Sequence, residues 1–170
     1  MDLESDEHYM RLALTGAAKA FDDGEVPVGA LVVQADTIVG RGHNRREQLQ
    51  SPLAHAETLA IEAAARNLGT WRLNDCCMYV TLEPCIMCVG AILQARVGRL
   101  VFGCLDAKAG AVESLYRLCE DERLNHRLPA VGGVLAQDCA ALLESFFSRL
   151  RERKRHIKNT ERWPSPAEGA

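Results

Sequence analysis

The feature that most constrains this chain is a His-Ala-Glu triplet at residues 55–57, followed by Pro-Cys-Ile-Met-Cys at residues 84–88. The two segments supply one imidazole, two thiols and one carboxylate. Three nitrogen and sulfur ligands leave one position of a tetrahedral Zn²⁺ open, as is typical of a catalytic rather than a structural zinc site. The sequence therefore predicts one zinc ion per chain, bound by His55, Cys85 and Cys88.

Glu57 is not needed as a ligand and is the predicted catalytic residue. A water molecule at the open zinc position would have its pKa lowered toward about 7. A carboxylate beside that water can take its proton and pass it to a substrate, so that it acts first as base and then as acid. The alternative is a structural site with three cysteines, in which Cys77 or Cys104 fills the fourth position.

The spacing of the ligands also predicts where the metal lies. Cys85 and Cys88 are three residues apart, so they share one face of a helix expected to begin at Pro84. His55 and Glu57 are two residues apart, and both can reach one point only beyond the N-terminal end of their helix. The positive end of a helix favours thiolates. We therefore expect the metal to lie between two helix N-termini.

The hydropathy pattern predicts an α/β fold. Helices are expected over residues 6–20, from just after Pro52 to 68, and over 84–95, 112–119 and 138–155, the last with Asp138 as its N-cap. Strands are expected over residues 30–34, 37–42, 76–82, 99–103 and 131–135, with polar loops at 44–51 and 106–110. This order predicts a three-layer α/β/α sandwich around a five-stranded mixed sheet.

Length and composition predict one domain and no membrane partner. The 170 residues are 48% hydrophobic, which suits a single globular domain over residues 1–158. The proline- and glycine-containing end, residues 159–170, is expected to be a disordered tail. The longest apolar run, Cys85 to Leu93, is far shorter than the roughly 20 residues that a membrane span needs.

Cysteine usage and charge bear on location and partners. Seven cysteines without disulfide-like spacing, and an acidic start without a signal peptide, predict a cytoplasmic protein. The net charge of −3 conceals an acidic first quarter and a basic segment over residues 141–162. Such a basic end can bind a polyanion. A solvated helix face is the plainer explanation, and charge alone favours it.

Beyond the metal motif, several segments resemble one known family. His-x-Glu followed by Pro-Cys-x-x-Cys is the established signature of zinc-dependent deaminases. The chain resembles the bacterial tRNA-specific adenosine deaminases of the cytidine/deoxycytidylate deaminase superfamily over roughly residues 6–155. The other segments that carry the resemblance are, in chain order, residues 25–30, 44–45, 79–84, 101–103, 106–111, 125–127 and 146–147.

This resemblance implies a cytidine deaminase-like fold and a zinc-dependent deaminase that works as a homodimer. The implied reaction is hydrolysis of adenosine to inosine, with release of ammonia, at the wobble position of the anticodon of a tRNA for arginine. It further implies that Asn44 holds the edge of the base, that Val28 packs on its face, and that the backbone of Ala56 positions the hydrated ring. The residues implied to contact splayed nucleotides of the anticodon stem-loop are Asp106, Lys108, Asn125, His126, Arg127 and Phe147.

The resemblance leaves some assignments open. Some family members place three arginines after the Phe-Phe pair, whereas this chain reads Ser-Arg-Leu-Arg, and we assign the phosphate contact to Arg151. Of the adjacent Phe146 and Phe147, one is expected in the core and the other toward RNA. By position alone, Asn44 could simply end a strand and Asp106 could simply cap a turn.

Two other functions compete with the tRNA interpretation. A deaminase of a free base or nucleotide, such as guanine, cytosine or dCMP, would keep the zinc site without the RNA contacts. An RNA-binding zinc module without enzymatic activity would keep the contacts without needing Glu57.

Overall fold

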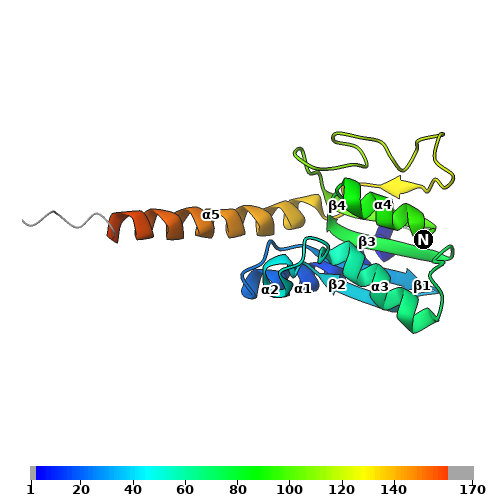
Figure 1. Ribbon diagram of the computed structural model, residues 1–170, viewed down its shortest axis with the longest axis horizontal. Helices are drawn as coiled ribbons and strands as arrows, with labels where there is room; N and C mark the ends of the chain where they lie inside the picture. The colour runs from blue at the N-terminus through cyan, green and yellow to red at the C-terminus, as the bar shows by residue number, and fades with distance from the viewer. Residues whose placement is uncertain (1–2, 161–170) are drawn as a thin grey trace, which may run out of the picture.

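The structure is a computed structural model that describes residues 3–160, with side chains described through residue 157. Five strands form one sheet in the order β2-β1-β3-β4-β5 (Figure 1). Strand β1 is antiparallel to β2 and to β3, whereas β3, β4 and β5 are parallel. The strands are β1 (Gly29–Gln34), β2 (Thr37–His43), β3 (Cys76–Leu82), β4 (Arg99–Cys104) and β5 (Ala130–Val131). The predicted mixed, five-stranded sheet is confirmed.

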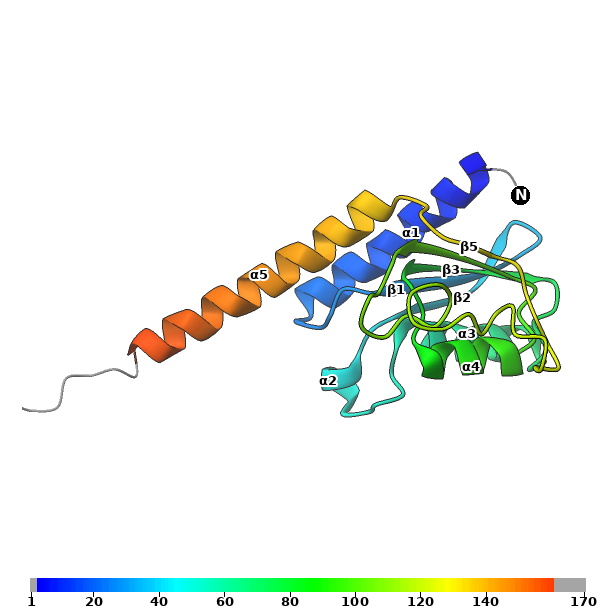
Figure 2. The same cartoon turned by 90° about the horizontal axis from the view of Figure 1, so that it is seen from above.

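Helices cover both faces of this sheet (Figure 2). Helices α1 (Leu3–Asp22) and α5 (Ala136–Thr160) lie on one face, while α3 (Ala56–Leu68) and α4 (Ile86–Gln94) lie on the other. Alternate residues of the central strand, β3, point to opposite faces of the sheet. Met78 packs in the core under α3 and α4, and Tyr79 packs in the core under α1. The predicted three-layer sandwich is therefore confirmed, and α5 extends well beyond the sheet. None of the helices described within residues 3–160 has the length and apolar content to cross a membrane.

One predicted element is wrong, and another is shorter than predicted. Residues 112–119 form turns instead of a helix: the N–H of Leu118 bonds to the carbonyl oxygen of Ala111, seven residues back, and not to that of Ser114. The last strand covers only Ala130–Val131, because the chain turns away at Gly133, whose φ is +90°.

Several helix boundaries also differ from prediction. A short helix, α2 (Arg46–Leu49), forms inside the expected polar loop. His55 is the N-cap of α3, and Cys85, not Pro84, precedes the first residue of α4. Helix α5 begins at Ala136, so Asp138 lies in its first turn and is not the N-cap. Of the tail expected over 159–170, residues 159 and 160 belong to α5, and the others lie outside the described residues.

Helix α3 lies directly on the backbone of β2. A Cβ added at Gly42 would collide with the carbonyl oxygen of Ala56, and one added at Gly40 would collide with that of Ala60. Only glycine permits so close an approach. The two glycines therefore fix the first turn of α3 over β2, and with it the positions of His55 and Glu57.

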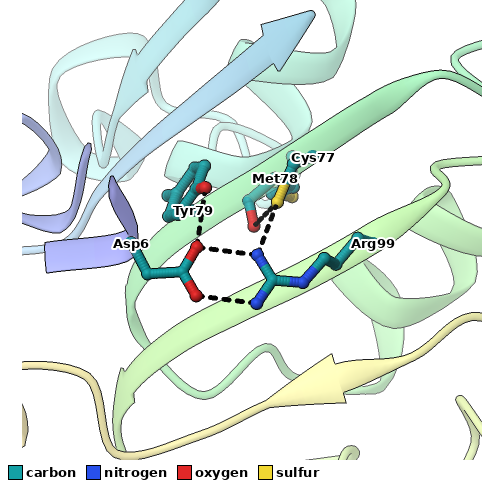
Figure 3. Close-up of polar contacts among 5 residues, drawn as sticks. All are labelled: Asp6, Cys77, Met78, Tyr79 and Arg99. Carbon is teal, nitrogen blue, oxygen red and sulfur yellow. Dashed lines mark hydrogen bonds and ion pairs between the residues drawn. The ribbon is translucent and has the colours of Figure 1, made fainter. Parts of the chain in front are cut away.

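A partly buried ion pair fastens α1 to the sheet (Figure 3). Asp6 is 3% exposed, and its two carboxylate oxygens accept hydrogen bonds from the two terminal nitrogens of Arg99, each at 2.7 Å. The hydroxyl of Tyr79 donates to the same carboxylate at 2.9 Å. The Arg99 guanidinium lowers the pKa of Asp6 below its ordinary value. Asp6 on α1 is thus bound to residues of β3 and β4.

We expect Asp6→Asn to lower the free energy of unfolding by about 3 kcal/mol, because it leaves the Arg99 guanidinium without its charged partner. Urea denaturation measures this loss. Glu7→Gln is the matched control, since it breaks an exposed ion pair with Arg11 on the same helix and should cost about 0.5 kcal/mol or less. Equal losses in the two variants would contradict the assignment.

The lowered pKa of Asp6 also determines how the stability difference between the native chain and Asp6→Asn depends on pH. The stabilisation is fully present above the unfolded-state pKa of about 3.9. It is lost as the pH falls through the lower, folded-state value. The stability gap between the native chain and Asp6→Asn should therefore shrink only in strongly acidic solution.

Candidate metal centre

Two helices begin at the same edge of the sheet. Strands β2 and β3 are both antiparallel to β1, so they run in the same direction. Helices α3 and α4 follow the carboxyl ends of these two strands, with His55 and Cys85 as their N-cap residues. The edge beyond the carboxyl ends of parallel strands is where α/β folds commonly bind ligands.

The three predicted ligands meet between these helix ends. Nδ1 of His55 lies 3.5 Å from Sγ of Cys88 and 3.8 Å from Sγ of Cys85, and the three ligand atoms all lie within 4.8 Å of one another. Tetrahedral zinc with Zn–N near 2.0 Å and Zn–S near 2.3 Å places such atoms about 3.5 Å apart. The donor set and its spacing therefore fit zinc.

A fourth protein ligand is missing from this cluster. Among the described residues, the group of His, Cys, Asp and Glu atoms close enough to share an ion contains only these three. Cys77 lies beside Arg99, and the Cys104 thiol points to the carbonyl oxygen of Thr81 at 3.6 Å. The arrangement disfavours the structural alternative, in which one of these cysteines would complete the site.

The cysteine pair is electrostatically prepared for a cation. A hydrogen bond from Cys88, together with one from His55, lowers the pKa of the Cys85 thiol to about 3. The same bond to Cys85 and burial raise the pKa of Cys88. One sulfur is thus a thiolate at neutral pH, and the second releases its proton when a metal ion binds.

Glu57 lies in the first turn of α3, beside a cavity of about 240 Å³. Its side chain is buried, and burial raises its pKa. A buried carboxyl whose pKa moves toward neutrality is suited to exchanging protons with a substrate. The other residues predicted to hold the base, Val28, Asn44 and Ala56, line the same cavity. Asp106, from the loop that follows β4, lines it too.

Glu83 fastens the loop that contains Asp106, a role that no sequence pattern predicted. Its Oε1 accepts N–H bonds from residues 112–114, and its Oε2 accepts the N–H of Asp106 and the hydroxyl of Ser114. Burial alone would raise its pKa, but these donors lower it to about 2. Asp106 in turn accepts the N–H groups of Lys108 and Ala109, which is the turn-capping role that its position allowed.

Three residues predicted to contact RNA lie together outside the cavity. Lys108, Phe147 and Arg151 line an open groove of about 780 Å³ along α5. Phe146 is buried whereas Phe147 is 42% exposed, so Phe146 is the ring that packs, and the contact of Phe147 with RNA stays a prediction. The loop over residues 106–109 contributes to both hollows, since Asp106 and Ala109 line the cavity.

The segment 125–127 lines neither hollow. Arg96 donates to the carbonyl oxygen of Asn125 at 3.0 Å, and His126 Nε2 lies 2.9 Å from the carbonyl oxygen of Val97. Because a carbonyl only accepts, that nitrogen of His126 carries the proton. Arg127 pairs with Glu122 at 3.4 Å. These contacts hold the segment beside the end of α4.

Comparison with known proteins identifies relatives of this chain. Residues 3–104 match the sequence profile of the "Cytidine and deoxycytidylate deaminase zinc-binding region". The chain is 46% identical over 153 residues to a tRNA-specific adenosine deaminase of Bacillus subtilis (strain 168), covering 90% of this chain and 95% of that one. It is 44% identical over 157 residues to a protein of the same name from Streptococcus pyogenes serotype M1, covering 92% of each.

A solved structure gives the same relationship. It comes from biochemical and structural studies of A-to-I editing by tRNA:A34 deaminases at the wobble position of transfer RNA. It superposes with a TM-score of 0.77 at 40% identity, covering 80% of this chain and 99% of that one.

We expect Cys88→Ala to reduce bound zinc from one ion per chain to nearly none, because two ligands hold the ion poorly. Elemental analysis of the purified protein measures this. Cys139→Ala is the control, since that thiol is equally buried but belongs to the core on the opposite face of the sheet. Full zinc occupancy in Cys88→Ala would contradict the ligand assignment.

Proposed function

Because this chain belongs to the cytidine and deoxycytidylate deaminase family, and within it to the tRNA-specific adenosine deaminases, we propose that it hydrolyses adenosine to inosine at the wobble position of a tRNA for arginine. The reaction adds one water to the purine and releases one ammonia. The observation that carries this proposal is the His55, Cys85 and Cys88 cluster beside the cavity that Glu57 lines.

Glu57 moves the protons of this reaction. A zinc ion held by His55, Cys85 and Cys88 would make water a nucleophile at neutral pH. The carboxylate of Glu57 takes the proton that water loses on attack and delivers it to the ring nitrogen next to the attacked carbon. Glu57, again a carboxylate, then takes the proton of the newly added hydroxyl and delivers it to the departing amine, so that ammonia leaves as the carbonyl of inosine forms. Burial favours the protonated form that these deliveries require.

The cavity selects an extruded base. The cavity offers about 240 Å³ of space lined by Val28, Asn44 and Asp106, among others, which is room for a single base. A stacked or paired base cannot reach Glu57, so the target must leave its stack, which anticodon-loop nucleotides do readily. We assign the face of the base to Val28, its polar contacts to Asn44 and the positioning of the hydrated ring to the backbone of Ala56.

The groove beside the cavity suits the neighbouring nucleotides. Lys108 and Arg151 offer cations to phosphates, and the exposed ring of Phe147 offers a surface on which a base can stack. We assign the remaining anticodon stem-loop contacts to Asp106 and to residues 125–127.

We also propose a homodimer that works in the cytoplasm. Leu53 and Ile86 are 62% and 57% exposed, and each lies within two residues of a proposed metal ligand. A second copy would remove this apolar surface from water. All seven cysteines are free thiols, as expected in a reducing compartment.

An assay of ammonia release tests the substrate class directly. The purified enzyme should release ammonia from a tRNA-Arg anticodon stem-loop that carries adenosine at the wobble position, and not from free adenosine, cytidine or guanine. Activity on a free base or nucleoside with none on the stem-loop would favour the competing free-base deaminase.

We expect Glu57→Gln to lower kcat on the stem-loop by at least about 10²–10⁴-fold, because the amide cannot relay protons. Zinc should remain near one ion per chain. Glu62→Gln on the exposed face of the same helix is the control and should keep full activity. An unchanged kcat in Glu57→Gln would support the non-enzymatic zinc module instead.

A further inference from the structure

Asn44 is a buried amide whose two hydrogens are both engaged. It is 6% exposed, and its Nδ2 donates to Oε2 of Glu25 at 3.3 Å and to the carbonyl oxygen of Val26 at 3.2 Å. A carboxylate and a carbonyl only accept hydrogen bonds. The atom of Asn44 that faces them must therefore be the nitrogen, which leaves the amide no further donor.

The remaining polar atom of Asn44 is its oxygen, Oδ1, which accepts no described hydrogen bond. Among the described residues, every fully buried side-chain nitrogen or oxygen has a partner. Oδ1 must consequently reach solvent, and Asn44 lines the cavity that also holds Glu57. Asn44 thus presents an acceptor, and not a donor, to whatever occupies the cavity.

Glu25 is a buried carboxylate with no role in the chemistry described above. It is 2% exposed, which is costly for a charged group without good partners. Its second oxygen, Oε1, accepts the backbone N–H of Gln48 at 2.7 Å. The same side chain therefore orients Asn44 and fastens α2, whose first residue, Arg46, lines the same cavity.

We propose that Glu25 is a positioning residue that fixes the hydrogen-bonding polarity of the substrate site by holding Asn44 with its oxygen toward the cavity. The group recognised by Asn44 is then a hydrogen-bond donor of the target nucleotide. In an internal adenosine of an RNA chain, the donors are the ribose 2′-hydroxyl and the exocyclic amine. This inference deepens the proposed function and rests on it.

The first test alters the donor and acceptor pattern one partner at a time. Glu25→Gln replaces one of two accepting oxygens by a donor, so either Gln48 or Asn44 loses its partner. Asn44→Asp places a carboxylate against the carboxylate of Glu25. We expect kcat/KM on the stem-loop to fall at least about tenfold in Glu25→Gln and at least about hundredfold in Asn44→Asp. Most of the fall should be a rise in KM, because unpaired polar groups at a binding site are costly.

The double variant Glu25→Gln with Asn44→Asp restores a match, because the new amide can donate to the new carboxylate. We expect it to be at least about tenfold more active than Asn44→Asp alone. Glu47→Gln makes the same chemical change on the exposed face of α2 and should leave both kcat and KM unchanged. No recovery in the double variant would overturn the proposal.

The second test does not depend on turnover. In ¹⁵N NMR spectra, both side-chain amide hydrogens of Asn44, identified by their loss in Asn44→Asp, should exchange slowly with solvent in the native chain. At least one should exchange much faster in Glu25→Gln. Rapid exchange of both hydrogens in the native chain would overturn the proposal. A native enzyme that is inactive on the stem-loop but has a protected Asn44 amide would refute the proposed function and leave the orientation of Asn44 established.

A stem-loop with 2′-deoxyadenosine at the target position distinguishes the two donors. If Asn44 accepts from the ribose, this substrate is poorer for the native enzyme but no poorer for Asn44→Ala. If Asn44 accepts from the exocyclic amine, the deoxy substitution has the same effect on both enzymes. An Asn44→Ala variant as active as the native enzyme on both substrates would contradict any contact.

Discussion

The meeting of two helix N-termini at one edge of the sheet is the constraint on which the rest of the site depends. Strand β1 lies between β2 and β3 and is antiparallel to both, so β2 and β3 run in the same direction. The helices that follow β2 and β3 therefore start side by side. Gly42 lets the first turn of α3 lie directly on β2. The N-cap positions of α3 and α4 then carry an imidazole and a thiol to within 3.8 Å of each other, although they are far apart in the chain.

Three acidic groups, Cys85, Glu83 and Glu57, lie around this meeting point, and each is held in a different way. The Cys85 thiolate is stabilised by hydrogen bonds from its neighbours, and Glu83 by backbone N–H groups of the following loop. Burial is the main influence on Glu57, and it raises the pKa of this side chain. Of these three groups, Glu57 is therefore the one placed to exchange protons with a substrate, while Cys85 acts as a ligand and Glu83 as a fixed anchor.

The sequence predicted the parts of the site that depend on residue type and spacing. His55, Cys85 and Cys88 follow from ligand chemistry, and Asn44 and Val28 follow from resemblance to a family. The roles of Glu83 and Glu25 could not be predicted, because most of their partners are backbone N–H groups of segments distant in the chain, which no side-chain pattern marks. The helix predicted at residues 112–119 is likewise absent, because a backbone bond from Leu118 to Ala111 closes a wider turn that no side-chain pattern marks.

The central claim is that three protein ligands hold a zinc ion whose fourth position is open to the cavity. X-ray absorption spectroscopy of the zinc-loaded enzyme measures the ligand set directly. The account predicts two sulfur neighbours near 2.3 Å, one imidazole nitrogen, and one further light atom that a bound inhibitor displaces. A third sulfur, a second imidazole or a fourth ligand that no inhibitor displaces would contradict it.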